Sequence, residues 1–248
     1  MKLLNDFALQ LYSIRDETEK DFIATLEKLG NKGLNYTGVE FAGFGGIPAE
    51  KMKQALDENG IKAIGSHTML DKLLNNLDEE ITYHKTIGAQ YIICPWADME
   101  TKADVLELAK KLTPVAEKVA AAGLKFGYHN HAHEFVVDDG EYLLDILFDN
   151  LPKSAVMELD IFWSEYADID SLAYMEKHKD RLEILHVKQI GEGKKNVEVD
   201  KGLIDFADVI KKAQAMGVKH FILEQEEYET SSMASVENAI KYIRGLEG

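Results

Sequence analysis

The stretch Ala122-Gly123-Leu124-Lys125-Phe126-Gly127-Tyr128-His129 contains the unit that decides the fold. An amphipathic segment ends at a glycine, two further residues follow, and a short apolar run begins. Glycine closes a helix in the left-handed conformation, after which the chain enters a buried strand. The stretch therefore predicts a helix that ends near Ala122 and a buried strand over Lys125–Asn130.

The same pattern recurs along the chain. Gly33, Gly60, Gly88 and Gly217 each precede a short apolar run in the same way. The runs start about every 30 residues, the length of one βα unit. Helical patterns separate them, which favours a parallel sheet. The eight expected strands are Phe7–Tyr12, Tyr36–Phe41, Lys62–His67, Tyr91–Pro95, Lys125–Asn130, Val156–Asp160, Ile184–Val187 and His220–Glu224.

Eight such units close into a (β/α)8 TIM barrel, so we expect an α/β fold with a single domain over residues 1–248. A doubly wound open sheet is the alternative. It would usually carry a glycine-rich phosphate loop after an early strand, and Phe44-Gly45-Gly46 does not fit the dinucleotide-binding pattern. Among the helices, Thr101–Ala122 is the longest, and we expect Pro114 to kink or split it. Asp205–Met216 and Met233–Leu246 are predicted as the last two helices.

Composition limits the classes of function. Of the 248 residues, 46% are hydrophobic, but no apolar run approaches the length of a membrane span. The opening residues Met1–Asp6 reach an acidic side chain too early for a signal peptide, so we expect a soluble, cytoplasmic protein without a membrane partner. The net charge of −16 disfavours a nucleic-acid partner. Cys94 is the single cysteine, so a disulfide within the chain is excluded.

Ionisable residues stand at the ends of several expected strands, where a buried strand should be apolar. They are His67, the run His129-Asn130-His131-Ala132-His133-Glu134, Glu158 and Asp160, His186 and Lys188, and the run Glu224-Gln225-Glu226-Glu227. In a barrel these ends gather on one face around one cavity. Imidazoles and carboxylates that converge there are typical of a divalent-metal site, which polarises a substrate carbonyl while a carboxylate such as Glu224 removes a neighbouring proton.

Each of these residues also has a plain structural explanation. Asp160 alone is typical of a helix cap or an ion-pair partner, and Glu224 alone of an acidic surface run. His186 lies between Leu185 and Val187, and alternation along a strand places either it or its two neighbours toward the barrel interior. Only the coincidence at four successive strands favours a metal site.

The motifs resemble the sugar phosphate isomerase/epimerase family, also called the xylose-isomerase-like barrel superfamily, essentially end to end. The most specific motif is Tyr128-His129-Asn130-His131-Ala132-His133-Glu134-Phe135. The weaker ones, in the expected order, are Gln10–Arg15, Val39-Glu40, Leu159–Trp163, Leu185–Lys188 and Leu223–Glu226.

The resemblance implies one divalent metal ion, Mn2+, Mg2+, Co2+ or Zn2+, held by residues of the last four strands. Asp160, His186 and Glu224 match the family's ligands, whereas His129 stands where the sugar epimerases have a glutamate. Either His129 is a ligand, or His131 or Glu134 takes over. The resemblance also implies catalytic roles for Glu224, His129, His131 and Lys188, and substrate contacts from Gln10, Arg15, Glu40, His67, Trp96, Glu134 and Trp163.

Four functions remain open at this stage. The first is a metal-dependent isomerase or epimerase of a small sugar, keto-sugar or polyol, acting through an enediolate. The second is a dehydratase or β-eliminating lyase on a keto-sugar or inosose, which the histidine-rich run near His129 favours. An abasic-site endonuclease and a non-catalytic sugar-binding protein are the other two. We also expect a homodimer.

Overall fold

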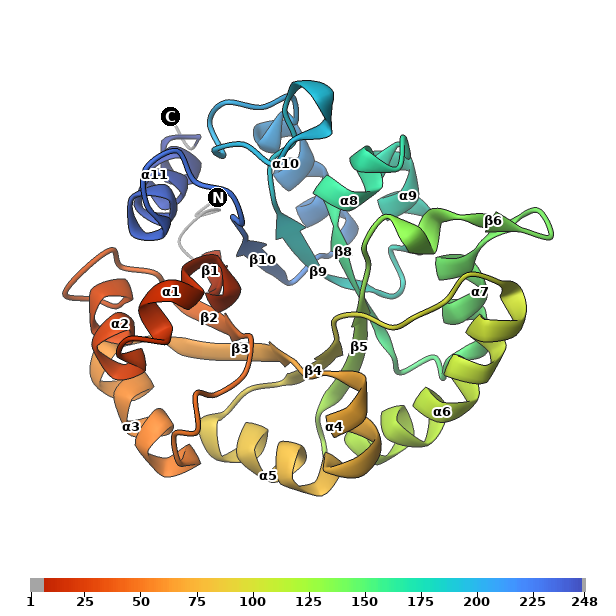
Figure 1. The fold of residues 1–248 in the computed structure, drawn as a ribbon, viewed down its shortest axis with the longest axis horizontal. Helices are drawn as coiled ribbons and strands as arrows, with labels where there is room; N and C mark the ends of the chain where they lie inside the picture. Colours follow the sequence, from red (N-terminus) through yellow and green to blue (C-terminus); the bar gives the residue numbers. More distant parts are fainter. Residues whose placement is uncertain (1–6, 247–248) are drawn as a thin grey trace.

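A computed structural model describes residues 7–246 of the chain. Its central feature is a closed barrel of eight parallel strands in the order β1-β10-β9-β8-β5-β4-β3-β2, surrounded by helices (Figure 1). The barrel strands are β1 Phe7–Gln10, β2 Gly38–Phe41, β3 Lys62–His67, β4 Tyr91–Cys94, β5 Lys125–His129, β8 Val156–Asp160, β9 Leu182–Val187 and β10 His220–Leu223. The barrel closes where β1 pairs with β10, with Ala8 opposite Ile222. The predicted TIM-barrel fold is confirmed.

The helices follow the strands along the chain. Their bounds are α1 Arg15–Thr18, α2 Phe22–Leu29, α3 Ala49–Asn59, α4 Leu70–Asn75, α5 Leu77–Ile87, α6 Lys102–Ala121, α7 Leu143–Asn150, α8 Ile161–Tyr166, α9 Ser171–His178, α10 Phe206–Met216 and α11 Ser232–Gly245. Short 3-10 turns cover η1 Leu11–Ile14, η2 His133–Phe135 and η3 Glu192–Lys194. No helix in the described range 7–246 is both long and apolar enough to cross a membrane.

One sequence expectation needs correction, and one small element was not expected. A kink or a split was expected at Pro114, and helix α6 runs through Pro114 without a break, so the split does not occur. Pro114 is exposed, and the carbonyl group that it deprives of an N–H partner lies one turn earlier on the same helix, where water can satisfy it. The sequence also gave no sign of the hairpin of β6 Val137–Asp138 and β7 Glu141–Tyr142, which projects from the ring between β5 and α7 (Figure 1).

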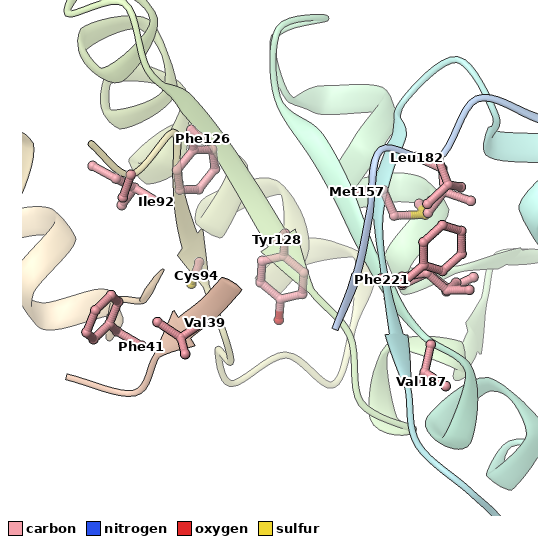
Figure 2. Close-up of a cluster of buried hydrophobic side chains, with 14 of the residues drawn as sticks. Val39, Phe41, Ile92, Cys94, Phe126, Tyr128, Met157, Leu182, Val187 and Phe221 are labelled. Carbon is pink, nitrogen blue, oxygen red and sulfur yellow. The ribbon is translucent and has the colours of Figure 1, made fainter. Parts of the chain in front are cut away.

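The hydrophobic core has two layers because successive side chains of a strand point to opposite faces. The larger layer fills the space between strands and helices, and Figure 2 shows part of it on β2, β4, β5, β8, β9 and β10. The smaller layer plugs the barrel interior and consists of Ala8, Ile64, Tyr91, Ile93, Val156, Ile184 and Ile222. Glu158, His186 and Glu224 lie two positions beyond Val156, Ile184 and Ile222 of this inner layer, so they share its inward-facing side.

Gly127 shows how tightly the inner layer is packed beneath the strand ends. A Cβ atom at this position would lie 2.5 Å from Cδ1 of Ile93 and 2.9 Å from Cγ2 of Val156. The next inward residue on β5 is His129, which therefore stands directly above this plug.

Candidate active site

Four side chains at the carboxyl ends of consecutive strands form a compact buried cluster. His129 ends β5, Asp160 ends β8, His186 lies on β9 and Glu224 follows β10. One potential ligand atom from each lies within 4.8 Å of the others. These are the four residues that the sequence predicts as metal ligands, and the structure brings them together. Their donor set of two imidazoles and two carboxylates suits a divalent transition metal.

The orientation of the four side chains fits a cation between them. Oδ2 of Asp160 is buried and accepts no hydrogen bond from any described residue. It lies 4.0 Å from Nε2 of His129, while Nδ1 of His186 lies 3.2 Å from Oε2 of Glu224. A buried carboxylate oxygen without a donor is costly, and a bound cation would satisfy it. The residues present could therefore hold a metal ion.

Burial and neighbouring charges strongly shift the pKa values of the residues in this cluster. Burial raises the pKa of Asp160 to about 7, although the nearby Lys188 opposes the shift. Burial would also raise the pKa of Glu224, but Lys188 and His186 outweigh it and hold that pKa well below its usual value. For His186, burial opposes the charge, yet contacts with Glu158, Glu224 and Glu40 hold its pKa well above the usual range. Burial lowers the pKa of His129 to about 4, so this ring is neutral near pH 7.

Two further buried carboxylates, Glu158 and Glu40, contact the histidines of the cluster. Glu158 of β8 is fully buried, and its Oε1 contacts three imidazoles: Nε2 of His67 at 2.7 Å, Nδ1 of His129 at 3.1 Å and Nε2 of His186 at 3.1 Å. Glu40 of β2 accepts a hydrogen bond from Nε2 of Gln10 at 2.9 Å, and its Oε2 lies 2.8 Å from Nε2 of His186. Sequence reasoning assigned no role to Glu158. The available signal was its spacing, because residues two apart on one strand share a face with Asp160.

Lys188, just after β9, is also fully buried. Its Nζ lies 3.0 Å from Oε1 of Glu226, 3.7 Å from Oε2 of Glu224 and 4.0 Å from Oδ2 of Asp160. The rings of Phe162 and Trp163 each lie 5.0 Å from the ammonium group. Burial opposes the charge, but Glu224, Asp160 and Glu226 outweigh it and raise the pKa of Lys188. A permanent positive charge therefore stands beside the candidate ligands.

A cavity of about 450 Å3 opens above this cluster. His129 and Glu224 reach it from below, and His67, His131 and Glu226 contribute polar groups to its wall. Burial lowers the pKa of His131 to about 2, so His131 is neutral there, and its Nδ1 has no hydrogen-bond partner among the described residues. Aromatic and apolar side chains form another part of the lining, which also includes Ser66, Thr68, Lys72 and Glu80; they are Tyr12, Phe44, Met69, Pro95 and Trp96.

Other predicted substrate contacts do not line this cavity. Gln10 and Glu40 lie buried beneath it. Arg15 instead braces the wall, since its guanidinium donates to the carbonyl of Tyr12 at 2.9 Å and to the Tyr228 hydroxyl at 3.1 Å. Trp163 packs against Lys188 and His131, with the His131 ring centroid 5.1 Å away.

Glu134 is also turned away from the candidate ligands. It is fully buried, and its carboxylate accepts hydrogen bonds from the Tyr128 hydroxyl at 2.9 Å and from the backbone N–H of His131 at 2.8 Å. Tyr128 belongs to the outer core layer, between the barrel and the helices. Of the three residues proposed to replace the strand-5 glutamate, His129 is therefore the one that the structure brings to the cluster.

Several solved structures share the fold of this chain along nearly its whole length. A sugar phosphate isomerase/epimerase from Parabacteroides distasonis ATCC 8503 has a TM-score of 0.81 at 23% identity, covering 96% of this chain and 92% of that one. The IOLI protein, solved with a bound zinc atom, has a TM-score of 0.77 at 12% identity, with 97% of each chain covered. A probable 3-DHS dehydratase, AsbF from Bacillus anthracis, has a TM-score of 0.74 at 12% identity, covering 96% and 98%. At these identities the likeness shows the fold alone.

No curated protein matches the chain in sequence. The family model described as xylose isomerase-like TIM barrel matches residues 24–246, which is most of the chain. This protein belongs to the xylose isomerase-like TIM barrel family.

Proposed function

We propose that this protein is a metal-dependent isomerase or epimerase of a small sugar, keto-sugar or polyol. The observation that carries the proposal is the cluster of His129, Asp160, His186 and Glu224 at the foot of a cavity. These four residues would hold one Mn2+, Mg2+, Co2+ or Zn2+ ion. When bound, the ion would supply Lewis acidity that makes the proton next to a substrate carbonyl easier to remove.

Glu224 is the group that we assign to proton removal. It reaches the cavity and is ionised near neutral pH, because Lys188 and His186 outweigh the burial that opposes its charge and hold its pKa well below the usual value. An ionised carboxylate at the cavity wall can accept a proton from the carbon beside the carbonyl and leave an enediolate. The ammonium group of Lys188, 3.7 Å from the same carboxylate, favours negative charge developing on the substrate oxygen.

His131 is the group that we assign to moving a proton between the two oxygens of the enediolate, while Glu224 returns the proton that it removed to carbon. His131 lines the cavity, and as a neutral imidazole it has one N–H donor and one acceptor nitrogen. It can therefore accept the hydroxyl proton from one oxygen of the enediolate and donate its own N–H proton to the other, so its charge is the same before and after the transfer. His129 is less suited to this role, since its Nδ1 faces Glu158 and its Nε2 faces Asp160.

Metal content is the first test. Elemental analysis of wild type purified without added metal should give about one equivalent of a divalent ion, and Asp160→Ala, His186→Ala and Glu224→Ala should each lose it. A matched control is Glu183→Gln, which changes a carboxylate that contacts Lys125, Lys219 and Tyr91 instead of the cluster. Wild type that stays metal-free even after reloading would overturn the proposal.

A lyase that eliminates water or an alcohol from a keto-sugar or inosose is the second candidate. The observation that favours it is His129 at the end of β5, where a two-base epimerase would need a second carboxylate. Isomerisation conserves the atoms of the substrate, whereas elimination releases a second product. Analysis of products from a panel of keto-sugars and inososes in D2O separates the two.

The substrate that we propose is a small molecule and not a nucleic acid, since the net charge of −16 repels phosphate backbones. A nicking assay on an abasic duplex tests this point. We further propose a cytoplasmic homodimer, which fractionation of the source cells and sedimentation of the purified protein would test.

A further inference from the structure

The carboxylate of Glu158 lies behind both histidines of the candidate metal cluster and takes no part in that cluster itself. Its Oε1 is 3.1 Å from Nδ1 of His129 and 3.1 Å from Nε2 of His186. These are the ring nitrogens on the far sides from Asp160 and Glu224, which lie near Nε2 of His129 and Nδ1 of His186. One oxygen atom thus contacts the outer nitrogen of each imidazole.

An imidazole that binds a metal through one nitrogen carries its proton on the other, and a hydrogen bond to that proton selects the tautomer. For His186, two acceptors lie near the outer nitrogen, Oε1 of Glu158 and Oε2 of Glu40 at 2.8 Å. For His129, the acceptor that the structure provides at Nδ1 is Glu158. The position of the ring proton should therefore depend on Glu158 more strongly in His129 than in His186.

Burying the charged carboxylate of Glu158 is energetically unfavourable. Glu158 has no exposed surface, and its Oε2 accepts no hydrogen bond from any described residue. A buried charge needs partners, and here the partners are three imidazoles instead of an arginine or a lysine. An apolar side chain would fill this position on β8 at lower cost, as Val156 does two residues earlier on the same face.

We infer that Glu158 is a positioning residue that holds His129 as the Nδ1–H tautomer and keeps the Nε2 proton of His186 in place when His186 gives up its Nδ1 proton, so that Nε2 of His129 and Nδ1 of His186 can bind a metal ion. The inference rests on the proposed metal site, but it concerns Glu158, which contacts the two histidine ligands and is not itself a ligand. Loss of such a partner typically lowers metal affinity about 10- to 100-fold.

Two variants test this role. Glu158→Gln keeps the size of the side chain and removes its charge, and Glu158→Leu removes the acceptor. We expect Co2+ and Zn2+ dissociation constants, measured by competition with a chelator, to rise about 10- to 100-fold in Glu158→Leu and less in Glu158→Gln. Glu183→Gln, at the opposite end of the barrel, should bind as wild type does. Affinities in both Glu158 variants equal to wild type would overturn the inference.

The 15N NMR chemical shifts of the histidine rings report which ring nitrogen carries the proton. They should not change if Glu158 only supports the fold. In metal-free wild type at neutral pH, the ring of His129 should show its proton on Nδ1. In Glu158→Leu it should revert to the Nε2–H form that free neutral histidine favours. If wild-type His129 already has the Nε2–H form, the inference is wrong.

These outcomes separate this inference from the proposed function. Wild type that binds no metal would overturn the function, yet the tautomer of His129 in the metal-free protein would still test Glu158. Glu158 also belongs to a second cluster of potential ligand atoms, with His67, His129 and His186. If Glu158→Leu lost all metal while Asp160→Ala and Glu224→Ala retained it, Glu158 would be a ligand, and its assignment as a positioning residue would be overturned.

Discussion

The ammonium nitrogen of Lys188, a fully buried side chain, lies 3.7 Å from Oε2 of Glu224 at the wall of the cavity. Lys188 is also 4.0 Å from Oδ2 of Asp160, so a protein cation already faces two of the proposed ligands. It offsets their negative charge in the metal-free protein and competes with a metal ion for the same carboxylates. The same charge would favour an anionic intermediate. Lys188 therefore weakens metal binding but assists the chemical step.

Replacing Lys188 with methionine should therefore separate the two effects. Without the ammonium group, metal binding should tighten by about tenfold or more, because unit charges about 4 Å apart interact by several kcal/mol at a partly shielded site. The turnover number should fall by about 100- to 1000-fold, as expected when a charge that stabilises an oxyanion is removed. Calorimetric titration and steady-state kinetics on the same preparation measure both.

Lys72→Met is the matched control for this experiment. Lys72 also lines the cavity and lies 3.6 Å from Glu80, but its side chain is 50% exposed, so solvent screens its charge. We expect little change in metal affinity. If Lys188→Met lost metal, Lys188 would be needed to hold the carboxylates in place and would not compete with the ion.

Changing His131 to glutamine should uncouple the two proton transfers. Metal binding should be retained, since His131 is outside the ligand cluster, and exchange of the substrate proton with solvent deuterium should continue through Glu224. Product formation should fall by about 100- to 10,000-fold because the second proton transfer loses its general acid–base group. Deuterium incorporation into recovered substrate, followed by NMR beside product yield, distinguishes the steps.

The control for that variant is His133→Gln, two residues further along the chain. His133 faces the carbonyl of Ala97, with Nε2 at 3.1 Å, and does not line the cavity. Both proton transfers should persist in it. Equal loss of exchange and product in His131→Gln would assign the first proton transfer to His131 and contradict the role of Glu224.

Metal affinity should depend on pH through the protons that an ion displaces. Burial raises the pKa of Asp160 to about 7 in the metal-free protein, so Asp160 is ionised above pH 7 and must release a proton to bind metal below it. Burial favours neutral His186, but its acidic neighbours hold its pKa well above the usual range. His186 must therefore release a proton to bind metal both above and below pH 7. Proton release should therefore rise from about one to about two per ion as the pH falls through 7.

Calorimetry in buffers of different ionisation enthalpy counts these protons between pH 6 and pH 8. As the pH is lowered, the apparent dissociation constant should increase by about tenfold per pH unit down to pH 7 and more steeply below pH 7. A flat profile would show that Asp160 and His186 are already unprotonated in the metal-free protein, contrary to the burial and charge that surround them.

The sequence predicted the barrel and the four clustered residues because both depend on local rules. A glycine-terminated helix followed by an apolar run defines each βα unit, and the closed barrel then brings the strand ends together. These rules placed His129, Asp160, His186 and Glu224 among the ionisable residues at the strand ends, and the family resemblance singled them out as ligands.

What the sequence missed depends on the direction of side chains beyond the strands and on contacts across the barrel. Glu134 was expected near the substrate, but the turn after β5 directs it to Tyr128. The spacing of Glu158 places it on the same face as Asp160, but its role depends on contacts with three imidazoles contributed by β3, β5 and β9.

Trp96 should contribute to substrate affinity more than to turnover. It lines the cavity and is 40% exposed, so its ring is accessible to a sugar face. Trp96→Ala should raise KM about 2- to 12-fold, which corresponds to the roughly 0.5–1.5 kcal/mol of an aromatic stacking contact, and leave kcat within about twofold. Tyr166→Ala, which removes a 40% exposed aromatic ring outside the cavity, is the control and should leave KM unchanged. An unchanged KM in Trp96→Ala would exclude stacking.

Gly127→Ala should destabilise the barrel beneath the site. The added methyl group would lie 2.5 Å from Cδ1 of Ile93 and 2.9 Å from Cγ2 of Val156, closer than packed carbon atoms allow, so the inner layer must shift. We expect a loss of about 1–3 kcal/mol in the free energy of unfolding, measured by urea denaturation. Gly245→Ala is the control, because nothing lies within 4 Å of its added methyl group. The double variant Ile93→Val with Gly127→Ala removes the nearest clashing atom and should recover part of the loss. If the double variant were no more stable than Gly127→Ala alone, the clash with Val156 and not with Ile93 would limit this position.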